Sequence, residues 1–357
     1  MLGLSGADRG KSGRYLSPLF VTGLVVLAAS CALAGRVPKI TRDEVEVLII
    51  LGSLFISVRC MELSGLLHRL AKRLEGRNHP ALSLTVATFL FSAVVTNDAA
   101  LTVMIPLTFL LRPPGLLPMI VLETLAANAG SALTPLGNPQ NLFLYWHYGL
   151  TLSQFVAAIA PLCAMVLVVL AITALFVRGR TPVLLPPPRV SPAHVVLQLA
   201  LLMICLAVIL RIFPPYVCLL IPIYAAAFEP RALHIDYALL IALLCFFGVA
   251  DNLSALLSAR LQHTSHIFLI TAFSSQVVSN VPAAVLMAEF TSRWEAVLWG
   301  ANVGGFGSPI ASLASLIACR LFYLRRPGAP TVKFCLVLWV AGSAVFALGC
   351  IGYLFFR

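Results

Sequence analysis

Charged residues are scarce in this chain. Asp, Glu, Lys and Arg together make up 10% of its 357 residues, whereas about a quarter of an average soluble protein is charged. Hydrophobic residues make up 60% of the chain, and the mean hydropathy is +0.99. So few charges do not cover the surface of a soluble protein, and apolar runs of about 20 residues recur along the chain. The composition therefore predicts an all-α polytopic membrane protein embedded in a lipid bilayer.

The motifs of the common enzyme classes are missing as well. The sequence has no HExxH, no GxSxG, no paired catalytic aspartates and no ATP-binding motif, so it lacks the parts of a hydrolase or of a self-contained pump. Its nine cysteines are scattered in apolar runs without CxxC pairs, as small buried hydrophobes are. We therefore expect neither an enzyme nor a bound cofactor.

Two apolar stretches are interrupted in a way that a simple membrane-crossing helix does not allow. Residues 80–111 would form a helix of about 48 Å, longer than a hydrocarbon core of about 30 Å. The polar triplet 96–98 divides this stretch into two arms that are each too short to cross. We expect a re-entrant hairpin with the triplet at its tip. Residues 266–291, interrupted at 279–280, predict a second hairpin.

Two further stretches contain Gly, Pro and Asn at a density that breaks a helix. Unwound backbone in a membrane survives only where protein or a water-filled cavity lines it, so we expect broken helices that cross. The prediction is two inverted repeats with about nine crossings, two hairpins and this layout: a cytoplasmic segment 1–16; a first transmembrane repeat 17–177 with the hairpin 80–111 and a broken helix 118–147; a Pro-rich cytoplasmic linker 178–192; and a second repeat 193–357 with the hairpin 266–291 and a broken helix 294–322.

The orientation follows from the positions of the basic residues. The net charge of +11 gives no reason to expect a nucleic-acid partner, because Lys and Arg lie in short loops between apolar segments. With the N-terminus in the cytoplasm and both hairpins counted as non-crossing, 17 of the 24 basic residues fall on the cytoplasmic side. This bias predicts a multi-pass protein of the bacterial inner membrane with a cytoplasmic N-terminus.

The same pair of motifs occurs twice. Residues 92–100, SAVVTNDAA, match residues 275–283, SQVVSNVPA, and residues 127–135, ANAGSALTP, match residues 301–309, ANVGGFGSP. Chance similarity of apolar residues does not explain Asn, Gly and Pro that recur at fixed offsets. In the topology above, the first hairpin enters from the cytoplasm and the second from outside, so the repeats are inverted. Inverted repeats with broken helices are typical of secondary transporters that work by alternating access.

The repeated motifs supply the candidate binding groups. Helix N-termini at a hairpin tip favour an anion, and unwound carbonyl groups favour Na⁺. Asn97, Asn128, Asn280 and Asn302 each offer a donor and an acceptor, and they are the candidate Na⁺ ligands. The predicted substrate and ion ligands are Thr96, Asn97, Asp98, Asn128, Ser131, Thr134, Asn138, Gln276, Ser279, Asn280, Asn302, Gly304 and Ser308.

Asp98 breaks the symmetry of the repeats, since Val281 stands at the matching position. A carboxylate near the centre of a bilayer is costly and points to a function, here to neutralising a cation or carrying a proton. The alternative is a cap for the returning arm of the hairpin. Glu123, Asp251 and Glu289 also lie in or near apolar stretches, and the sequence leaves open whether they face the pathway.

At residues 96–98, 127–141, 279–282 and 302–307 the chain resembles the ion transporter superfamily, and within it the YbiR-type anion transporters. That superfamily includes arsenite permeases, divalent-anion:sodium symporters, citrate transporters and sodium–proton antiporters. The resemblance implies an inverted-repeat transporter, often a homodimer, whose tips and broken helices bind substrate and Na⁺. The third position of both tips differs from the Thr of the symporters, and Asn-Asp at the first tip is closer to arsenite permeases and antiporters.

The expected function is secondary active transport of a small anion or oxyanion-like solute, coupled to H⁺ or Na⁺, with Asp98 as the coupling group. Two alternatives stay open: a cation/proton antiporter that uses Asp98, and the membrane subunit of an arsenite efflux system. A structural or receptor-like membrane protein would not need broken helices repeated in both halves.

Overall fold

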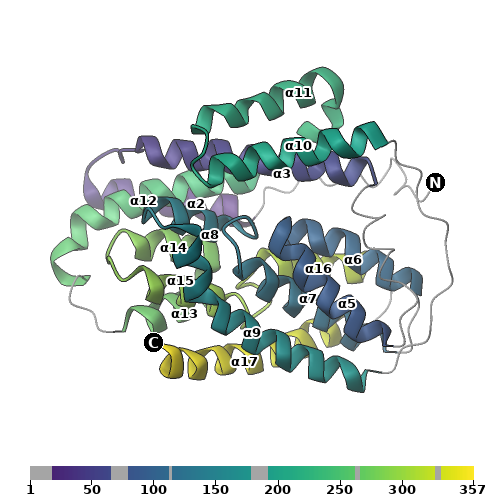
Figure 1. The fold of residues 1–357 in the computed structure, drawn as a ribbon. Helices are drawn as coiled ribbons and strands as arrows, with labels where there is room; N and C mark the ends of the chain where they lie inside the picture. The colour runs from purple at the N-terminus through teal and green to yellow at the C-terminus, as the bar shows by residue number, and fades with distance from the viewer. Residues whose placement is uncertain (1–17, 66–78, 112–114, 178–191, 262–265, 326–330) are drawn as a thin grey trace.

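The computed structural model (Figure 1) describes six ranges of the chain: 18–65, 79–111, 115–177, 192–261, 266–325 and 331–357. All regular secondary structure in these ranges is helical, as predicted. The predicted cytoplasmic segment 1–16 and nearly all of the linker 178–192 lie outside the described residues.

The helices follow one another along the chain in this order: α2 (Pro18–Ala34), α3 (Arg42–Leu63), α5 (Pro80–Val94), α6 (Asn97–Leu111), α7 (Leu116–Ala132), α8 (Pro139–His147), α9 (Leu152–Phe176), α10 (Pro192–Ile209), the 3₁₀ helix η1 (Pro215–Leu219), α11 (Leu220–Phe228), the 3₁₀ helix η2 (Pro230–Leu233), α12 (Tyr237–Leu261), α13 (Ile267–Val278), α14 (Asn280–Ala288), α15 (Trp294–Gly304), α16 (Leu313–Arg325) and α17 (Thr331–Phe356).

Two of the long helices begin where their own sequence supplies a cap. The amide of Gln154 donates to the hydroxyl of Thr151 at 3.3 Å, and the amide of Thr151 donates to the side chain of Gln154 at 2.9 Å. This capping box satisfies two backbone groups at the start of α9. Thr41 and Glu44 form the same pair at the start of α3. The start of each of these two helices is therefore set by its own local sequence.

Each predicted interruption is a break between two helices. The first hairpin consists of α5 and α6, which separate at 95–96, and the second consists of α13 and α14, which separate at Ser279. The first broken helix is α7 followed by α8, and the second is α15 followed by α16. The four breaks lie at 95–96, 133–138, 279 and 305–312. That the hairpins re-enter the membrane rather than cross it stays a prediction.

The helices form two groups in Figure 1. One group consists of α2, α3, α10, α11 and α12 and is called here the peripheral layer; within it α3 packs against α10, α11 and α12. The other helices, α5–α9 and α13–α17, form the central bundle, which holds both hairpins and both broken helices. Contacts between the two groups include α3 on α6 and α12 on α14. The peripheral layer therefore lies directly against both hairpins.

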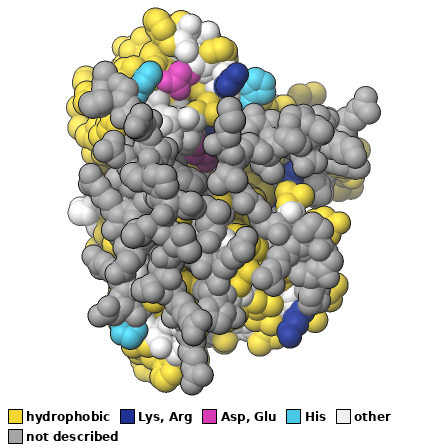
Figure 2. Space-filling model, turned by 90° about the vertical axis from the view of Figure 1, so that its right-hand side faces the viewer, with side chains coloured by type: hydrophobic (Ala, Val, Ile, Leu, Met, Phe, Trp, Pro, Cys, Tyr) yellow, Lys and Arg dark blue, Asp and Glu magenta, His cyan; other side chains and the backbone are white. Residues whose placement is uncertain are grey.

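The outer surface of the described chain is largely apolar. On the face drawn in Figure 2, the described surface is mainly hydrophobic, and charged side chains lie in a few separate places. Leu354 and Phe355 of α17 are 81% and 82% exposed, which suits contact with lipid. Within the described ranges, three stretches are long and apolar enough to cross a membrane alone: Leu152–Phe176, Pro230–Ala255 and Val332–Phe356. Shorter apolar helices accompany them. The fold is polytopic as predicted, and the count of nine crossings stays a prediction.

One glycine in each repeat lets the hairpin approach the broken helix. A Cβ on Gly130 of α7 would lie 2.0 Å from the carbonyl oxygen of Phe89 in α5, and a Cβ on Gly304 of α15 would lie 2.4 Å from the Cβ of Ser275 in α13. Side chains do not tolerate such distances, so both helix pairs need glycine at the contact. Gly130 and Gly304 match in the repeat alignment, so the two halves pack in the same way.

Candidate functional site

Both hairpin tips are tied to the loop of the broken helix in the same repeat. The amide of Asn97 donates to the carbonyl of Gly137 at 3.1 Å, and the amide of Asn280 donates to the carbonyl of Ala311 at 2.9 Å. Gly137 and Ala311 lie at matching positions when the second repeated motif is aligned. The two repeats therefore build their tips with the same backbone bond.

Each half also supplies a partner for an asparagine of the other half. Asn128 of α7 donates to Ser315 of α16 at 3.5 Å, and Asn302 of α15 donates to Asn141 of α8 at 2.8 Å. Asn128 matches Asn302 in the repeat alignment, and Asn141 matches Ser315. Ser312 adds a further bond, since its hydroxyl donates to Asn128 at 3.0 Å. The contacts are reciprocal, which is the arrangement that a two-fold axis between the halves produces.

The four predicted Na⁺ ligands lie at the tips and at the ends of the helices beside them. Asn97 donates to Asn128 at 3.5 Å. Asn280 lies against the backbone of Gly305, where an added Cβ would be 2.9 Å from its side-chain nitrogen. The four side chains are each 5–7% exposed, so they are buried but not sealed off. Among the described residues no three His, Cys, Asp or Glu side chains gather at a metal site, so amide and carbonyl oxygens are the donors available for Na⁺ at the tips.

At the first tip, Thr96 rather than Asp98 caps the returning helix. The amide of Ala99 donates to the hydroxyl of Thr96 at 3.3 Å, and the amide of Asp98 donates to the side chain of Asn97 at 2.9 Å. The capping alternative for Asp98 is therefore wrong. Its Oδ1 atom is buried and has no hydrogen-bond partner within the described structure. Such an oxygen is costly unless a proton, a cation or water meets it.

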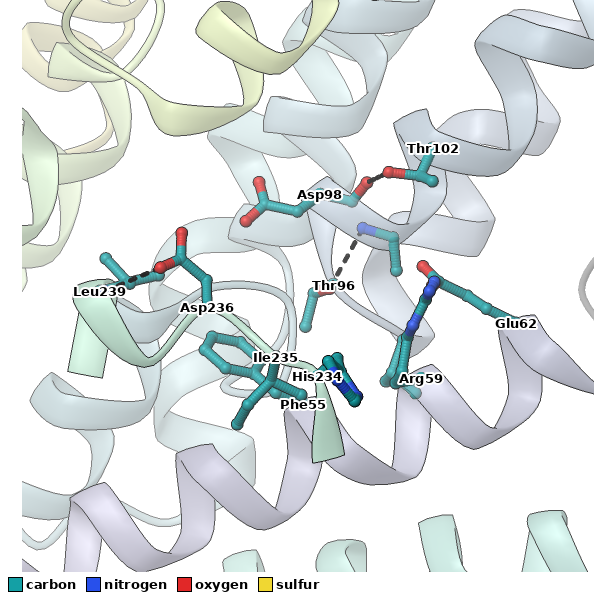
Figure 3. A pocket seen from close by; sticks show the side chains of 12 residues that line it. Phe55, Arg59, Glu62, Thr96, Asp98, Thr102, His234, Ile235, Asp236 and Leu239 are labelled. Atoms are coloured by element: carbon teal, nitrogen blue, oxygen red, sulfur yellow. Dashed lines mark hydrogen bonds and ion pairs between the residues drawn. The ribbon is translucent and has the colours of Figure 1, made fainter. Parts of the chain in front are cut away.

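Asp98 lines a pocket between the first tip and the peripheral layer (Figure 3). The pocket has a volume of about 150 Å³. Thr96, Asp98 and Thr102 belong to its wall on the side of the tip. The opposite wall comes from α3 and from the segment around the start of α12, and its main members are Phe55, Arg59, Glu62, His234, Asp236 and Leu239. None of the charged residues of this second wall was predicted from the sequence.

The second tip has an unusual backbone and no charge. Ser279 stands at the break with a φ of 75°, a left-handed conformation that residues with a side chain rarely adopt. Its hydroxyl donates to the carbonyl of Ala311 at 3.2 Å, which helps to hold this conformation. Val281 occupies the position of Asp98 and is buried. The two tips therefore share their backbone bond and differ in charge.

Three predicted ligands of the second half hold the backbone together. The side chain of Gln276 donates to the carbonyl of Gly304 at 2.5 Å and accepts the amide of Ser308 at 2.6 Å. In the first half the hydroxyl of Thr134 donates to the carbonyl of Ala93 at 2.6 Å, at the matching junction. The polar atoms of Gln276 and Thr134 join the hairpin to the broken helix in their own repeats. Whether they also touch substrate stays a prediction.

Ser131 and Asn138 lie inside the first broken helix. Asn138 donates to Ser131 at 3.3 Å and caps α8 by accepting the amide of Asn141 at 3.0 Å. The side chain of Asn141 donates to the carbonyls of Ser131 and Ala132 at 3.2 and 3.0 Å. Ser315 was not predicted. Extending the repeat alignment beyond residue 309 pairs Ser315 with Asn141 and would have identified it.

Glu123, Asp251 and Glu289 are not among the residues that line the pocket. The sequence had left open whether these acidic side chains point toward the transport pathway. Glu123 is fully buried, and one of its carboxylate oxygens accepts a hydroxyl group from α6. Asp251 forms an ion pair with Arg36 at 2.5 Å. Glu289 lies 3.8 Å from His147. Asp98 is therefore the acidic residue of the central bundle that lines the described pocket.

Known proteins share this sequence over most of its length. A family model described as a citrate transporter matches residues 16–293. The chain is 34% identical over 301 residues to the inner membrane protein YbiR of Escherichia coli strain K12, which covers 78% of this chain and 80% of that protein. It is 28% identical over 252 residues to an uncharacterized transporter of Methanocaldococcus jannaschii, which covers 67% of this chain and 70% of that protein.

A third relative matches only in part. A silicon efflux transporter of Oryza sativa subsp. japonica is 34% identical over 96 residues, which is 26% of this chain and 20% of that protein. The family match is far longer and includes the first hairpin, the first broken helix and the second hairpin. It confirms the resemblance that the motifs indicated. The chain therefore belongs to the citrate transporter family and is a multi-pass membrane protein of the class of secondary anion transporters.

Proposed function

We propose that this protein carries a small oxyanion across the bacterial inner membrane by alternating access, coupled to H⁺ or Na⁺ that is held at Asp98. The placement of Asp98 carries this proposal. Asp98 stands at a hairpin tip, lines a pocket, and has a buried carboxylate oxygen without a hydrogen-bond partner in the described structure. A group of this kind in a membrane is a site for a proton or cation.

The second tip is the better place for the anion. α14 begins there at Asn280, and the start of a helix carries a partial positive charge that attracts anions. Val281 replaces the aspartate of the first tip, so no carboxylate at this tip repels an anion. Asn302 and the backbone around Gly305 lie beside it and offer further polar groups. On this proposal the first tip binds the cation and the second tip binds the anion.

A cation on Asp98 lowers the cost of moving the central bundle. An ionised carboxylate is expensive to carry through the low-dielectric interior, and a bound proton or Na⁺ neutralises it. Thr96 and Asn97 precede it at the tip, and Asn128 accepts a bond from Asn97. All three carry oxygen atoms of the kind that Na⁺ takes. Movement therefore follows cation binding, which is the physical basis of coupling.

We infer that the pocket faces the cytoplasm in the predicted orientation. Arg59 and Arg231 are on the cytoplasmic side by the count of basic residues, and the pocket is walled by the segments that carry them or directly follow them. At the other side of the membrane, Arg211 of the peripheral layer lies over the rings of Tyr145 and Trp146 at 5.3 and 5.2 Å. On this proposal the conformation is inward-facing, and Arg211 helps to hold the peripheral layer against the central bundle on the outer side.

Flux measurements in proteoliposomes test the proposal. The purified protein is reconstituted, and uptake of citrate, a dicarboxylate, sulfate, arsenite and silicic acid is measured with an imposed pH or Na⁺ gradient. Silicic acid is included because one relative is a silicon efflux transporter. We expect uptake of one oxyanion that depends on one of the two gradients. Flux of Na⁺ or H⁺ without any oxyanion would overturn the proposal.

A cation/proton antiporter is the second candidate because of the charge in the pocket. Glu62, Asp98 and Asp236 place three carboxylates there against the single guanidinium of Arg59. Exchange of Na⁺ for H⁺ in the absence of every tested anion would favour it. Arsenite flux that appears only when a separate ATPase is added would instead favour the membrane subunit of an arsenite efflux system. The predicted homodimer is tested by the mass of the protein in detergent.

A further inference from the structure

The pocket beside Asp98 is charged on both of its walls. Asp98 is the charged group on the side of the tip, and the peripheral layer contributes Arg59 and Glu62 from α3 and His234 and Asp236 from the segment before α12. The two walls belong to different groups of helices. The electrostatic surroundings of Asp98 therefore depend on how the central bundle lies against the peripheral layer.

Asp236 is held in one orientation. Its Oδ1 atom accepts the amide of Leu239 at 3.1 Å, so Asp236 caps the start of α12. Figure 3 shows this bond and shows the other carboxylate oxygen on the side of Asp98. Two carboxylates that face one small pocket repel each other when both are ionised. A proton or cation bound between tip and layer relieves that repulsion.

The other charges in the pocket offset one another. Arg59 and Glu62 form an ion pair at 2.5 Å, one turn apart on α3. The negative charge of Glu62 is therefore balanced within its own helix. His234 also lines this wall, and an imidazole adds no negative charge. Asp236 takes part in none of the described ion pairs. It is therefore the acidic residue of this wall whose charge acts on Asp98 without being balanced by a paired cation.

We propose that Asp236 is a positioning residue for the coupling cation: its charge raises the affinity of Asp98 for H⁺ or Na⁺ while the protein faces inward. This inference rests on the proposed function of Asp98. When the bundle moves, Asp98 leaves Asp236 and its affinity for the cation falls. The cation is then released more readily on the outer side. By linkage, a bound cation stabilises the inward-facing arrangement relative to the outward-facing one, while neutralisation of Asp98 still lowers the barrier between them.

The substitution Asp236→Asn tests this role, because it removes the charge and keeps a residue that caps a helix well. The concentration of H⁺ or Na⁺ on the pocket side that gives half-maximal transport is expected to rise about three- to tenfold, as for loss of one charge in a partly solvated pocket. For H⁺ coupling the pH profile of transport shifts to lower pH, because Asp98 then needs a higher H⁺ concentration to be protonated. For Na⁺ coupling the half-saturating Na⁺ concentration rises. The maximal rate is expected to stay the same.

Three further variants separate the charge from the structure. Asp236→Ser also removes the charge and keeps a cap, so the same rise is expected, and it replaces the first variant should that one not fold. Glu46→Gln removes an acid from an i,i+4 pair elsewhere on α3 and is expected to change nothing. His234→Gln removes the titratable imidazole, and the effect of Asp236→Asn is expected to persist in that background.

The outcomes distinguish this inference from the proposed function. An unchanged half-maximal cation concentration in Asp236→Asn, together with lost coupling in Asp98→Asn, would overturn the inference and leave the proposed function intact. A lower maximal rate with an unchanged half-maximal concentration would make Asp236 purely structural and overturn the inference too. Cation dependence that survives in Asp98→Asn would overturn both.

Discussion

The side chain of Asn302 donates to the side chain of Asn141 at 2.8 Å, and this bond joins the two repeats beside both helix breaks. Asn302 also donates to the carbonyl of Leu298 at 2.8 Å. Asn302→Ala removes both bonds and leaves the oxygen of Asn141 buried without this donor. We expect the free energy of unfolding to fall by about 1–3 kcal/mol, measured as a lower thermal transition in detergent.

A double-mutant cycle isolates the bond between Asn302 and Asn141. We expect Asn141→Ala to destabilise the protein as well, because its side chain also holds two carbonyls of the first broken helix. The loss in the double variant should be smaller than the sum of the two single losses, because the shared bond is counted once. Strictly additive losses would show that the contact between the repeats contributes nothing to stability.

Asp98→Asn is expected to uncouple transport from the cation gradient while the protein still folds. Asn is close to Asp in size, and the backbone of the tip is held by Thr96 and Asn97. Gradient-driven uptake should fall about 5- to 150-fold, the range that corresponds to a coupling free energy of about 1–3 kcal/mol. The measurement compares gradient-driven uptake with exchange of substrate at equal cation concentrations, which should persist. Unchanged uptake kinetics and pH dependence would remove Asp98 from the mechanism.

Gly130→Ala and Gly304→Ala are expected to prevent stable folding. The added Cβ would lie 2.0 Å from a backbone oxygen at Gly130 and 2.4 Å from a side-chain carbon at Gly304. The helices cannot separate without losing the contact between hairpin and broken helix, so we expect a cost of more than about 3 kcal/mol. The yield of monodisperse protein in detergent measures the effect.

Gly52→Ala is the matched control for the two glycine substitutions. It also lies inside a helix, but its added Cβ would meet only the end of the Leu240 side chain, at 3.4 Å. A neutral effect or a gain of up to about 1 kcal/mol is expected there, because Ala favours a helix more than Gly does. Equal losses at Gly52 and Gly130 would contradict the close-packing argument.

Gln276→Ala is expected to slow transport without changing the response to the coupling cation. The substitution removes the bonds to the carbonyl of Gly304 and the amide of Ser308, which join the second hairpin to its broken helix. We expect a stability loss of about 1–3 kcal/mol and a lower maximal rate. A changed half-saturating cation concentration would instead support the predicted role of Gln276 as an ion ligand.

The helix breaks and the tip residues could be predicted because Asn, Gly and Pro interrupt apolar runs at offsets that recur. Asn97 and Asn128 lie together as the repeated motifs suggested. The direction of the polar groups could not be predicted in the same way. Gln276 and Thr134 point at backbone rather than at open space, because the packing of neighbouring helices decides where a side chain points.

The wall of the pocket that the peripheral layer forms could not be predicted, for a different reason. Arg59 and Asp236 belong to no repeated motif, and they reach Asp98 because the peripheral layer packs against the first hairpin. Contacts of that kind depend on tertiary structure and leave no local pattern in the sequence. Ser315 is the opposite case, because the repeat alignment contained the information needed to find it.

The reciprocal bonds between the repeats bear on the direction of transport. With identical tips, a two-fold axis would make the two ends of the pathway interchangeable, and the protein would run equally fast either way. Asp98 opposite Val281 removes that equivalence. Cation gradients of equal size and opposite direction should therefore drive substrate transport at unequal initial rates. The final ratio of substrate concentrations across the membrane still depends only on the gradient. On the proposed function, the difference between Asp98 and Val281 makes the rates of transport in the two directions unequal.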